Sequence, residues 1–183
     1  MMYNRHIYYK GYTDMSDTSS LDLQSFYPSD LKILAVRETD DEIRIRMHST
    51  SNNCKCHKCG APLIKHHGSH HRTVQDLPIL GKRVMLDMQI FDYNCTSATC
   101  GGRFASTETF DGFLSYNSRM TERLEDFMCL LATETSCEAS ARIMKAMKVK
   151  TSGDTVIRLL IKRYKAQPEP ACGNIIGVDD FAF

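Results

Sequence analysis

Two pairs of cysteines, each followed at once by glycine, constrain the fold of this chain more than any other feature. The first pair lies in Cys56-His-Lys-Cys59-Gly60 and the second in Cys95-Thr-Ser-Ala-Thr-Cys100-Gly101. Two thiolates three positions apart can hold one ion, and glycine lets the chain turn sharply beneath the sulfurs. The predicted ligands of one structural zinc ion are Cys56, Cys59, Cys95 and Cys100. Such an ion stabilises a region that is too small to bury a sufficient core.

Other interpretations of these segments stay open. The four cysteines can instead be buried, reduced thiols without a metal, and Cys54 competes with its neighbours as a ligand. We prefer Cys56 and Cys59 because their spacing fits the turn. The histidine-rich segment His66–His71 can supply ligands for a second ion, but we interpret it as a polar loop open to phosphate contact. A catalytic zinc ion is disfavoured, because four cysteines leave no coordination position for water.

Composition limits the class of protein. The sequence has 183 residues and eight cysteines, with no apolar run of the roughly 18 residues that a membrane span needs. Its first 20 residues lack the apolar stretch of a secretory signal. We therefore expect a cytoplasmic protein with no membrane partner, in which cysteines bind metal rather than form disulfides.

The first half of the chain predicts strands. Residues 1–29 show no sustained period, and we expect them to be flexible. Two segments, Leu31–Arg37 and Glu42–His48, flank a pair of aspartates. Apolar and polar residues alternate in the second segment, and together the two predict a β-hairpin. Gly81–Tyr93 alternates in the same way and leads into Cys95. We assign residues 30–115 to a β-hairpin followed by a zinc ribbon.

Residues 116–166 predict a three-helix domain. The first helix is expected over Ser118–Thr133, and the second opens with the capping-box pattern Thr135-Ser-Cys-Glu138. The third is expected to start at Thr151 or Ser152 and to end near Lys165. Two helices, a short turn and a third helix are typical of a helix-turn-helix, in which the third helix enters the major groove.

The outer face of that third helix is predicted to bind DNA. This segment carries ten basic and six acidic side chains, an excess that suits phosphate contact. The predicted DNA-binding residues are Thr155, Arg158, Lys162, Arg163 and Lys165. The residues expected to face the core are Val156, Ile157, Leu160, Ile161 and Tyr164. A plain three-helix bundle with solvated lysines is the alternative interpretation.

Several motifs, taken in order, carry a family resemblance. After the first knuckle come His70-His-Arg72 and Asp76-Leu-Pro78 with Gly81, and after the second comes Phe104. Glu138-Ala-Ser-Ala-Arg142, Thr151–Arg158 and Ile176-Gly-Val-Asp-Asp-Phe-Ala182 follow. From Cys54 to its end the chain resembles the N-terminal part of a bacterial insertion-sequence transposase, which combines a zinc ribbon, a helix-turn-helix and an RNase H-like DDE domain.

The resemblance implies recognition of the terminal inverted repeats of a mobile element, with double-stranded DNA as the partner. It also implies that residues 167–183 are a linker and the orphan first strand of an RNase H-like fold. Asp179 would be the first acid of a catalytic triad, with Asp180 as the alternative. Magnesium belongs only to a complete catalytic domain, in which three carboxylates hold two ions.

The resemblance also implies a truncated protein without catalytic activity, since no second or third catalytic acid follows Asp179. The expected fold class is therefore α+β and multi-domain. Two other functions stay open: a zinc-ribbon adaptor or regulatory protein that binds protein partners, and a nuclease that acts through Asp179 and Asp180. The sequence leaves open whether the chain forms a homo-oligomer.

Overall fold

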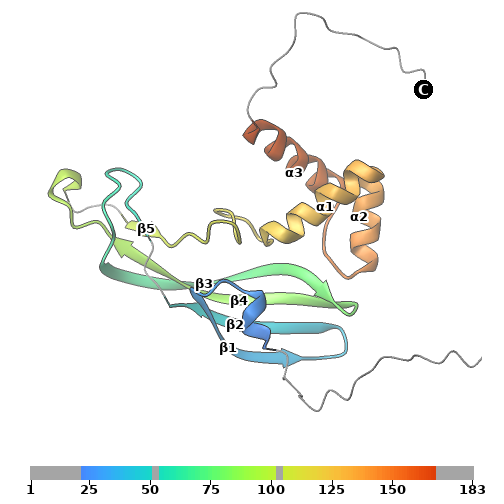
Figure 1. The fold of residues 1–183 in the computed structure, drawn as a ribbon, viewed down its shortest axis with the longest axis horizontal. Helices are drawn as coiled ribbons and strands as arrows, with labels where there is room; N and C mark the ends of the chain where they lie inside the picture. Colours follow the sequence, from blue (N-terminus) through green and yellow to red (C-terminus); the bar gives the residue numbers. More distant parts are fainter. Residues whose placement is uncertain (1–21, 51–53, 102–104, 168–183) are drawn as a thin grey trace, which may run out of the picture.

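The computed structural model describes residues 22–50, 54–101 and 105–167, in which a mixed β-sheet is followed by three helices (Figure 1). The expected α+β class is confirmed. The strands are β1 (Leu31–Glu38), β2 (Glu42–Ser49), β3 (Lys65–Ile79), β4 (Lys82–Asn94) and β5 (Ala105–Thr107). The α-helices are α1 (Glu122–Glu134), α2 (Cys137–Ala146) and α3 (Gly153–Ala166), and two short 3-10 helices are η1 (Leu23–Phe26) and η2 (Ala98–Cys100). None of the helices in these ranges is long and apolar enough to cross a membrane.

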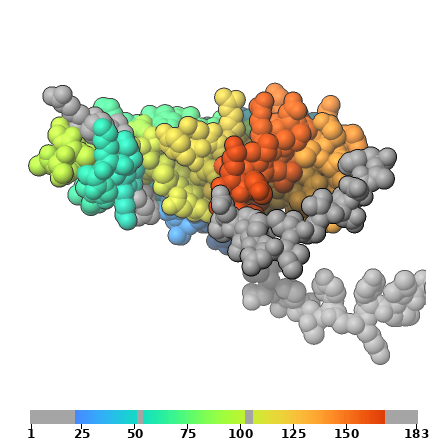
Figure 2. All heavy atoms as spheres, turned by 90° about the horizontal axis from the view of Figure 1, so that it is seen from above, coloured from blue at the N-terminus to red at the C-terminus, as the bar shows by residue number. Residues whose placement is uncertain are grey.

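The sheet has the strand order β1-β2-β4-β3, and β5 pairs with the end of β4. β1 and β2 form the predicted hairpin, and β4 matches the strand predicted over Gly81–Tyr93. β2 runs parallel to β4, whereas β3 and β4 are antiparallel. The first hairpin is therefore continuous with the strands that lead to the cysteines. The segments that contain Cys54–Cys59 and Cys95–Cys100 lie at one end of the elongated molecule, and the helices lie toward the other (Figure 2).

The long strand β3 is the element that the sequence analysis missed. The histidine-rich segment His66–His71 was expected to be a polar loop, but it forms the first half of β3 and pairs with β4 from Tyr93 to Gln89. Its own alternation is weak, because both of its faces are polar. Strand structure here is imposed by the partner strand rather than by local preference.

One face of the sheet is apolar and holds the main core. Its fully buried side chains are Ile45, Met47, Val74, Val84, Leu86, Met88 and Ile90. Tyr27, Phe110 and Phe113 cover this face, with the rings of Tyr27 and Phe113 edge to face at 6.1 Å. Residues 22–29 lie in the stretch expected to be flexible, yet η1 and the buried Tyr27 form part of this cover. Residues 1–21 lie outside the described part of the chain.

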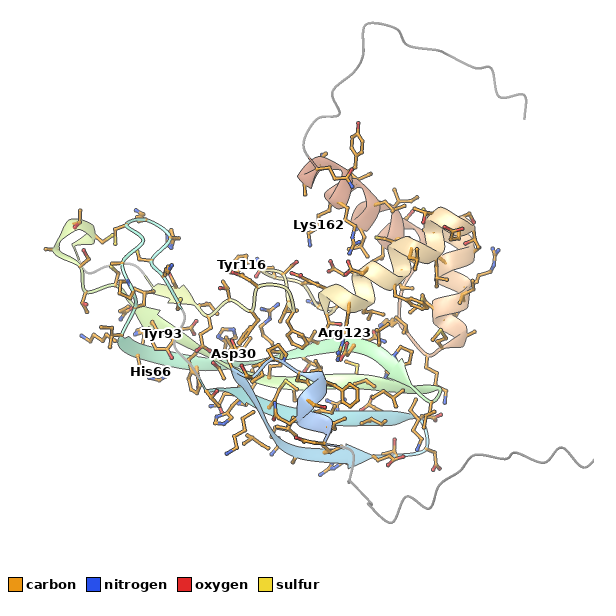
Figure 3. The ribbon with its side chains drawn as sticks, viewed as in Figure 1. Asp30, His66, Tyr93, Tyr116, Arg123 and Lys162 are labelled. Atoms are coloured by element: carbon orange, nitrogen blue, oxygen red, sulfur yellow. The ribbon has the colours of Figure 1, made fainter. Side chains whose placement is uncertain are left out.

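A buried carboxylate joins the sheet to the helices. Asp76 on β3 is 1% exposed, and it forms an ion pair with Arg123 of α1 (Figure 3). The hydroxyl of Thr121 donates to Asp76 Oδ1 at 2.7 Å, and the N–H of Leu77 donates to the same oxygen at 2.8 Å. Arg123 also donates to the Phe26 carbonyl at 2.9 Å. This network locks α1 against β3 and against the cover of the core.

The helices match the three predicted, with shifts at their starts. α1 begins at Glu122 rather than Ser118, because the residues before it extend along β3: Gln75 N donates to Arg119 O and Thr121 N to Gln75 O. The capping box predicted from Thr135 does not form. Ser136 is the N-cap of α2 instead, and its hydroxyl accepts from Ala139 N. Ser152 caps α3 as expected.

We predict that Asp76→Ala lowers the free energy of unfolding by about 3 kcal/mol, because it removes the shared acceptor of the buried Thr121 hydroxyl, the Leu77 N–H and the partly buried Arg123 guanidinium. Urea denaturation followed by circular dichroism measures this. Asp41→Ala is the matched control, since Asp41 pairs with Lys148 at the exposed surface and should contribute little. Equal stability of the two variants would contradict the role of Asp76.

Candidate metal centre and nucleic-acid interface

The first cysteine knuckle is a tight turn held by backbone hydrogen bonds. Cys56 N donates to Ala61 O at 2.9 Å, and Gly60 N donates to Cys56 O at 2.8 Å. Gly60 has φ +68°, a left-handed conformation that glycine adopts without a steric penalty. The turn therefore places the sulfurs of Cys56 and Cys59 on the same side of the chain, as the spacing predicted.

The second knuckle begins where β4 ends at Asn94. Cys95 follows directly, and η2 then turns the chain back so that Cys100 lies opposite. Gly101 ends η2 with φ +64°, and its N–H donates to Ala98 O at 3.3 Å. The extra residues between Cys95 and Cys100 are accommodated by this single 3-10 turn.

The structure brings the four predicted ligands together. All four sulfurs lie within 4.8 Å of one another, with Cys56 and Cys100 at 3.8 Å and Cys59 and Cys95 at 3.7 Å. Four thiolates at the zinc–sulfur distance of roughly 2.3 Å in a tetrahedron are about 3.8 Å apart. The cluster can therefore bind a metal such as zinc, with all four positions closed by cysteine.

The electrostatics of the cluster suit a cation. Backbone N–H groups of Cys59 and Lys58 lower the pKa of the Cys56 thiol to about 6. The neighbouring sulfur of Cys59, together with burial, raises the pKa of Cys100 to about 12. One thiolate thus forms readily and then opposes ionisation of its neighbours. A divalent ion at the centre removes this conflict, since it binds thiolates and displaces their protons.

Cys54 lies beside the cluster but is not one of its four members. Its thiol donates to the Thr107 carbonyl at 3.3 Å, and burial raises its pKa. The preference for Cys56 over Cys54 as a ligand agrees with this geometry.

His66 packs its ring against Phe91 and Tyr93, with centroids 5.3 and 5.8 Å apart (Figure 3).

A second buried carboxylate, Glu108, joins the cysteine end to the sheet. It is 5% exposed and accepts hydrogen bonds from Ser49 Oγ at 2.9 Å and Phe91 N at 3.0 Å. Burial raises the pKa of this carboxyl group. No local pattern in the sequence marked Glu108, because its partners come from distant strands.

We predict that the purified protein holds about one zinc ion per chain, and that Cys95→Ser abolishes stoichiometric binding, as measured by elemental mass spectrometry. The matched control, Cys54→Ser, should keep the metal. Acidification should release the ion, because protons compete for the thiolates. Loss of zinc from the Cys54 variant, with retention in the Cys95 variant, would overturn this assignment of ligands.

The three helices pack into one unit around a small core. Leu124, Met128, Met144 and Val149 are buried together at its centre, and the hydroxyl of Ser140 donates to Met128 O across the contact between α1 and α2 at 2.9 Å. α3 packs through Val156, Leu159 and Leu160. A short link joins α2 to α3, and Ser152 caps the start of α3.

The expected core face of α3 is wrong for three residues. Ile157, Ile161 and Tyr164 are 43%, 47% and 71% exposed. Apolar residues occupy two adjacent sides of the helix, and periodicity alone does not say which side meets α1. The side with Val156 and Leu160 does, which leaves an exposed apolar strip beside the basic one.

The five predicted DNA-binding residues fall into two groups. Lys162 and Arg163 form ion pairs with Glu125 and Asp126 of α1. Arg158 and Lys165 are exposed and form no ion pair within the described residues. Thr155 is partly exposed, and its N–H donates to Ser152 Oγ at 3.3 Å. Arg158 and Lys165 are thus the predicted contacts whose charge is available to a ligand.

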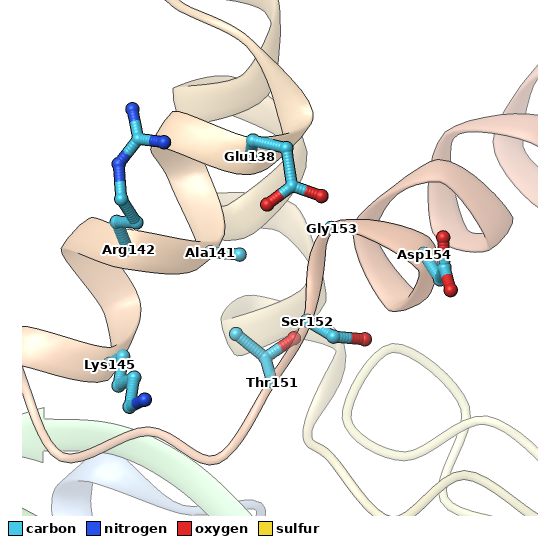
Figure 4. Close-up of a pocket in the computed structure, with 8 residues that line it drawn as sticks. All are labelled: Glu138, Ala141, Arg142, Lys145, Thr151, Ser152, Gly153 and Asp154. Atoms are coloured by element: carbon cyan, nitrogen blue, oxygen red, sulfur yellow. The ribbon is translucent and has the colours of Figure 1, made fainter.

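A glutamate covers one side of the start of α3. The Glu138 carboxylate of α2 lies against Gly153, and a Cβ atom added at Gly153 would be 2.0 Å from its oxygen (Figure 4). A negative charge at a helix N-terminus is favourable. Glycine at this position therefore allows α2 and α3 to approach closely, while Glu138 neutralises this side of the helix end.

The proposed catalytic acid cannot be placed, since Asp179 and Asp180 lie outside the described residues.

Comparison of the chain with known protein families, with curated proteins and with solved structures gives no match.

We predict that Gly153→Ala displaces the flexible end of the Glu138 side chain, and that losing its contact with the start of α3 costs up to about 1 kcal/mol in the free energy of unfolding, partly offset by the higher helix propensity of alanine. The same glycine change in a Glu138→Ala background should cost less, because the clash is then absent. Equal costs in both backgrounds would show that the two residues do not interact.

Proposed function

We propose that this protein binds double-stranded DNA by inserting α3 into the major groove, with a zinc-bound cysteine cluster stabilising the far end of its sheet. The observation that carries the proposal is the helical trio itself, in which α3 is anchored by its apolar side and by Lys162 and Arg163. This packing turns Arg158 and Lys165 outward without a counter-charge among the described residues.

Position along α3 assigns different roles to these residues. Thr155 and Arg158 lie in the first half of the helix, which in helix-turn-helix proteins contacts base edges. Arginine donates two hydrogen bonds to guanine in the major groove, so Arg158 is the residue best suited to sequence discrimination. Lys165 lies three turns from the helix start and suits a phosphate.

The transposase resemblance supplies the target in this proposal. The order of cysteine knuckles, buried Asp76 and helical trio is what supports it. On this basis the DNA sites are the terminal inverted repeats of a mobile element, and this part of the chain recognises them without performing catalysis.

A second candidate, a zinc-ribbon adaptor that binds protein, is favoured by the exposed strip of Ile157, Ile161 and Tyr164. Exposed apolar side chains grouped on one helix are a common feature of protein interfaces. The two functions use different sides of α3, so single substitutions separate them.

We predict that Arg158→Ala weakens binding to a duplex that carries the element's end by about tenfold to a hundredfold, through lost base contacts. Mobility-shift titration at fixed salt measures this. Arg37→Ala removes the same charge from β1, at the edge of the sheet opposite β3, and should have a much smaller effect. A wild-type chain that binds no duplex, with a protein partner that Arg158→Ala retains and Ile161→Ala loses, would favour the adaptor.

A further inference from the structure

The start of α3 separates two hollows of opposite character. The hollow in Figure 4, of about 280 Å³, lies between α2 and α3 and is lined by two acids, Glu138 and Asp154, besides Arg142 and Lys145. The hollow on the other side, of about 460 Å³, opens toward the sheet, and no acidic residue lines it. An anion that approaches this helix end therefore meets lining carboxylates on one side only; on the other, Asp87 accepts from the Thr73 hydroxyl at 3.2 Å and is paired with Arg44.

The acid-free hollow is a groove between the sheet and α3. Its floor is Thr73, Gln75 and Met85, which belong to the polar face of the sheet, opposite the core. Its far wall is the start of α3, with Ser152 and Thr155. Because Thr155 belongs both to the groove and to the predicted reading helix, a duplex on α3 lies directly over the groove.

Three cations border this groove and its extension along the outer edge of β3, where the segment before α1 runs beside the strand. Arg119 and Lys150 line the groove itself. Arg119 and Thr73 also line the adjoining hollow of about 400 Å³, together with Arg72. The adjoining hollow has no acidic lining residue either. The two hollows share Thr73 and Arg119, so together they form one basic channel past the start of α3.

None of these three cations has a carboxylate partner among the described residues, whereas Arg44, Arg83 and Arg123 each form an ion pair. Arg72 donates to the Ser118 carbonyl at 2.5 Å, and burial lowers the pKa of its guanidinium. A partly buried cation paired only with a neutral carbonyl is stabilised by an incoming anion.

We infer that this channel, defined by Arg72, Arg119 and Lys150, holds the sugar-phosphate backbone of the same duplex that α3 reads. The inference rests on the proposed function. It assigns a share of DNA binding to β3 and to the segment before α1, outside the helical trio. The channel positions the duplex, while α3 discriminates its sequence.

The test is the salt dependence of duplex binding by the full chain, measured by fluorescence anisotropy. Each phosphate contact contributes nearly one unit to the slope of log affinity against log salt. We expect Arg119→Ala and Lys150→Ala each to reduce that slope by about 1, and the double variant by about 2, without altering the preference among sequences. Arg119→Lys should retain the slope, which separates lost charge from misfolding.

Lys65→Ala is the matched control, because Lys65 is an exposed cation at the cysteine end of β3. It should leave the slope unchanged. An unaltered slope in the double variant, with binding still weakened by Arg158→Ala, overturns the channel and leaves the proposed function standing. A wild-type chain that binds no duplex overturns the proposed function itself. Polyglutamate binding that the double variant loses, with its duplex slope intact, assigns the channel to an acidic protein instead.

Discussion

The antiparallel ladder between β3 and β4 is the constraint on which the rest of the structure depends. It extends from the pair Lys65 and Asn94 at the cysteine end to the pair Ile79 and Lys82 at the turn. Consecutive backbone hydrogen bonds make such a ladder stiff, and its twisted geometry is largely independent of which side chains it carries. The cysteine cluster and the helices are both attached to the β3–β4 pair. The register of this pair therefore fixes the distance and rotation between them.

A buried carboxylate lies at each attachment, beside apolar contacts: Leu63 and Tyr93 pack among the cysteines, and Leu77 of β3 packs against the core of the helices. Glu108 connects the cysteine end to β2 and β4, and Asp76 connects β3 to α1. Burying a charged group is costly unless hydrogen bonds and an opposite charge compensate it, so such contacts tolerate few alternative geometries. They restrict the orientation of the attached units more strictly than apolar packing alone would.

Local sequence patterns predicted most of the helices and strands. The features that these patterns missed depend on contacts between segments that are distant in the sequence. Glycine after each knuckle and the spacing of Cys56 and Cys59 were sufficient for the cluster, because turn geometry is local. β3 was missed since its strand character comes from β4. The buried side of α3 was predicted wrongly for Ile157 and Ile161, because their helical spacing is that of core residues. Only the position of α1 shows which side of α3 is buried. The basic channel was invisible in the sequence, for its cations come from three separate segments.

The chain order around the ribbon affects the entropy of metal binding. The two knuckles are far apart in sequence, and an ion that joined them in an open chain would have to close the whole intervening loop. The residues between them are mostly β3 and β4, joined by the two-residue turn at Leu80 and Gly81, where both φ angles are positive as the tightest hairpins require. Once the hairpin has formed from this turn, Lys65 and Asn94 are paired, and only short segments separate this pair from Cys59 and Cys95. The ion then closes only the short segments that flank the ribbon, and most of its binding free energy remains available to hold the ends of the strands together.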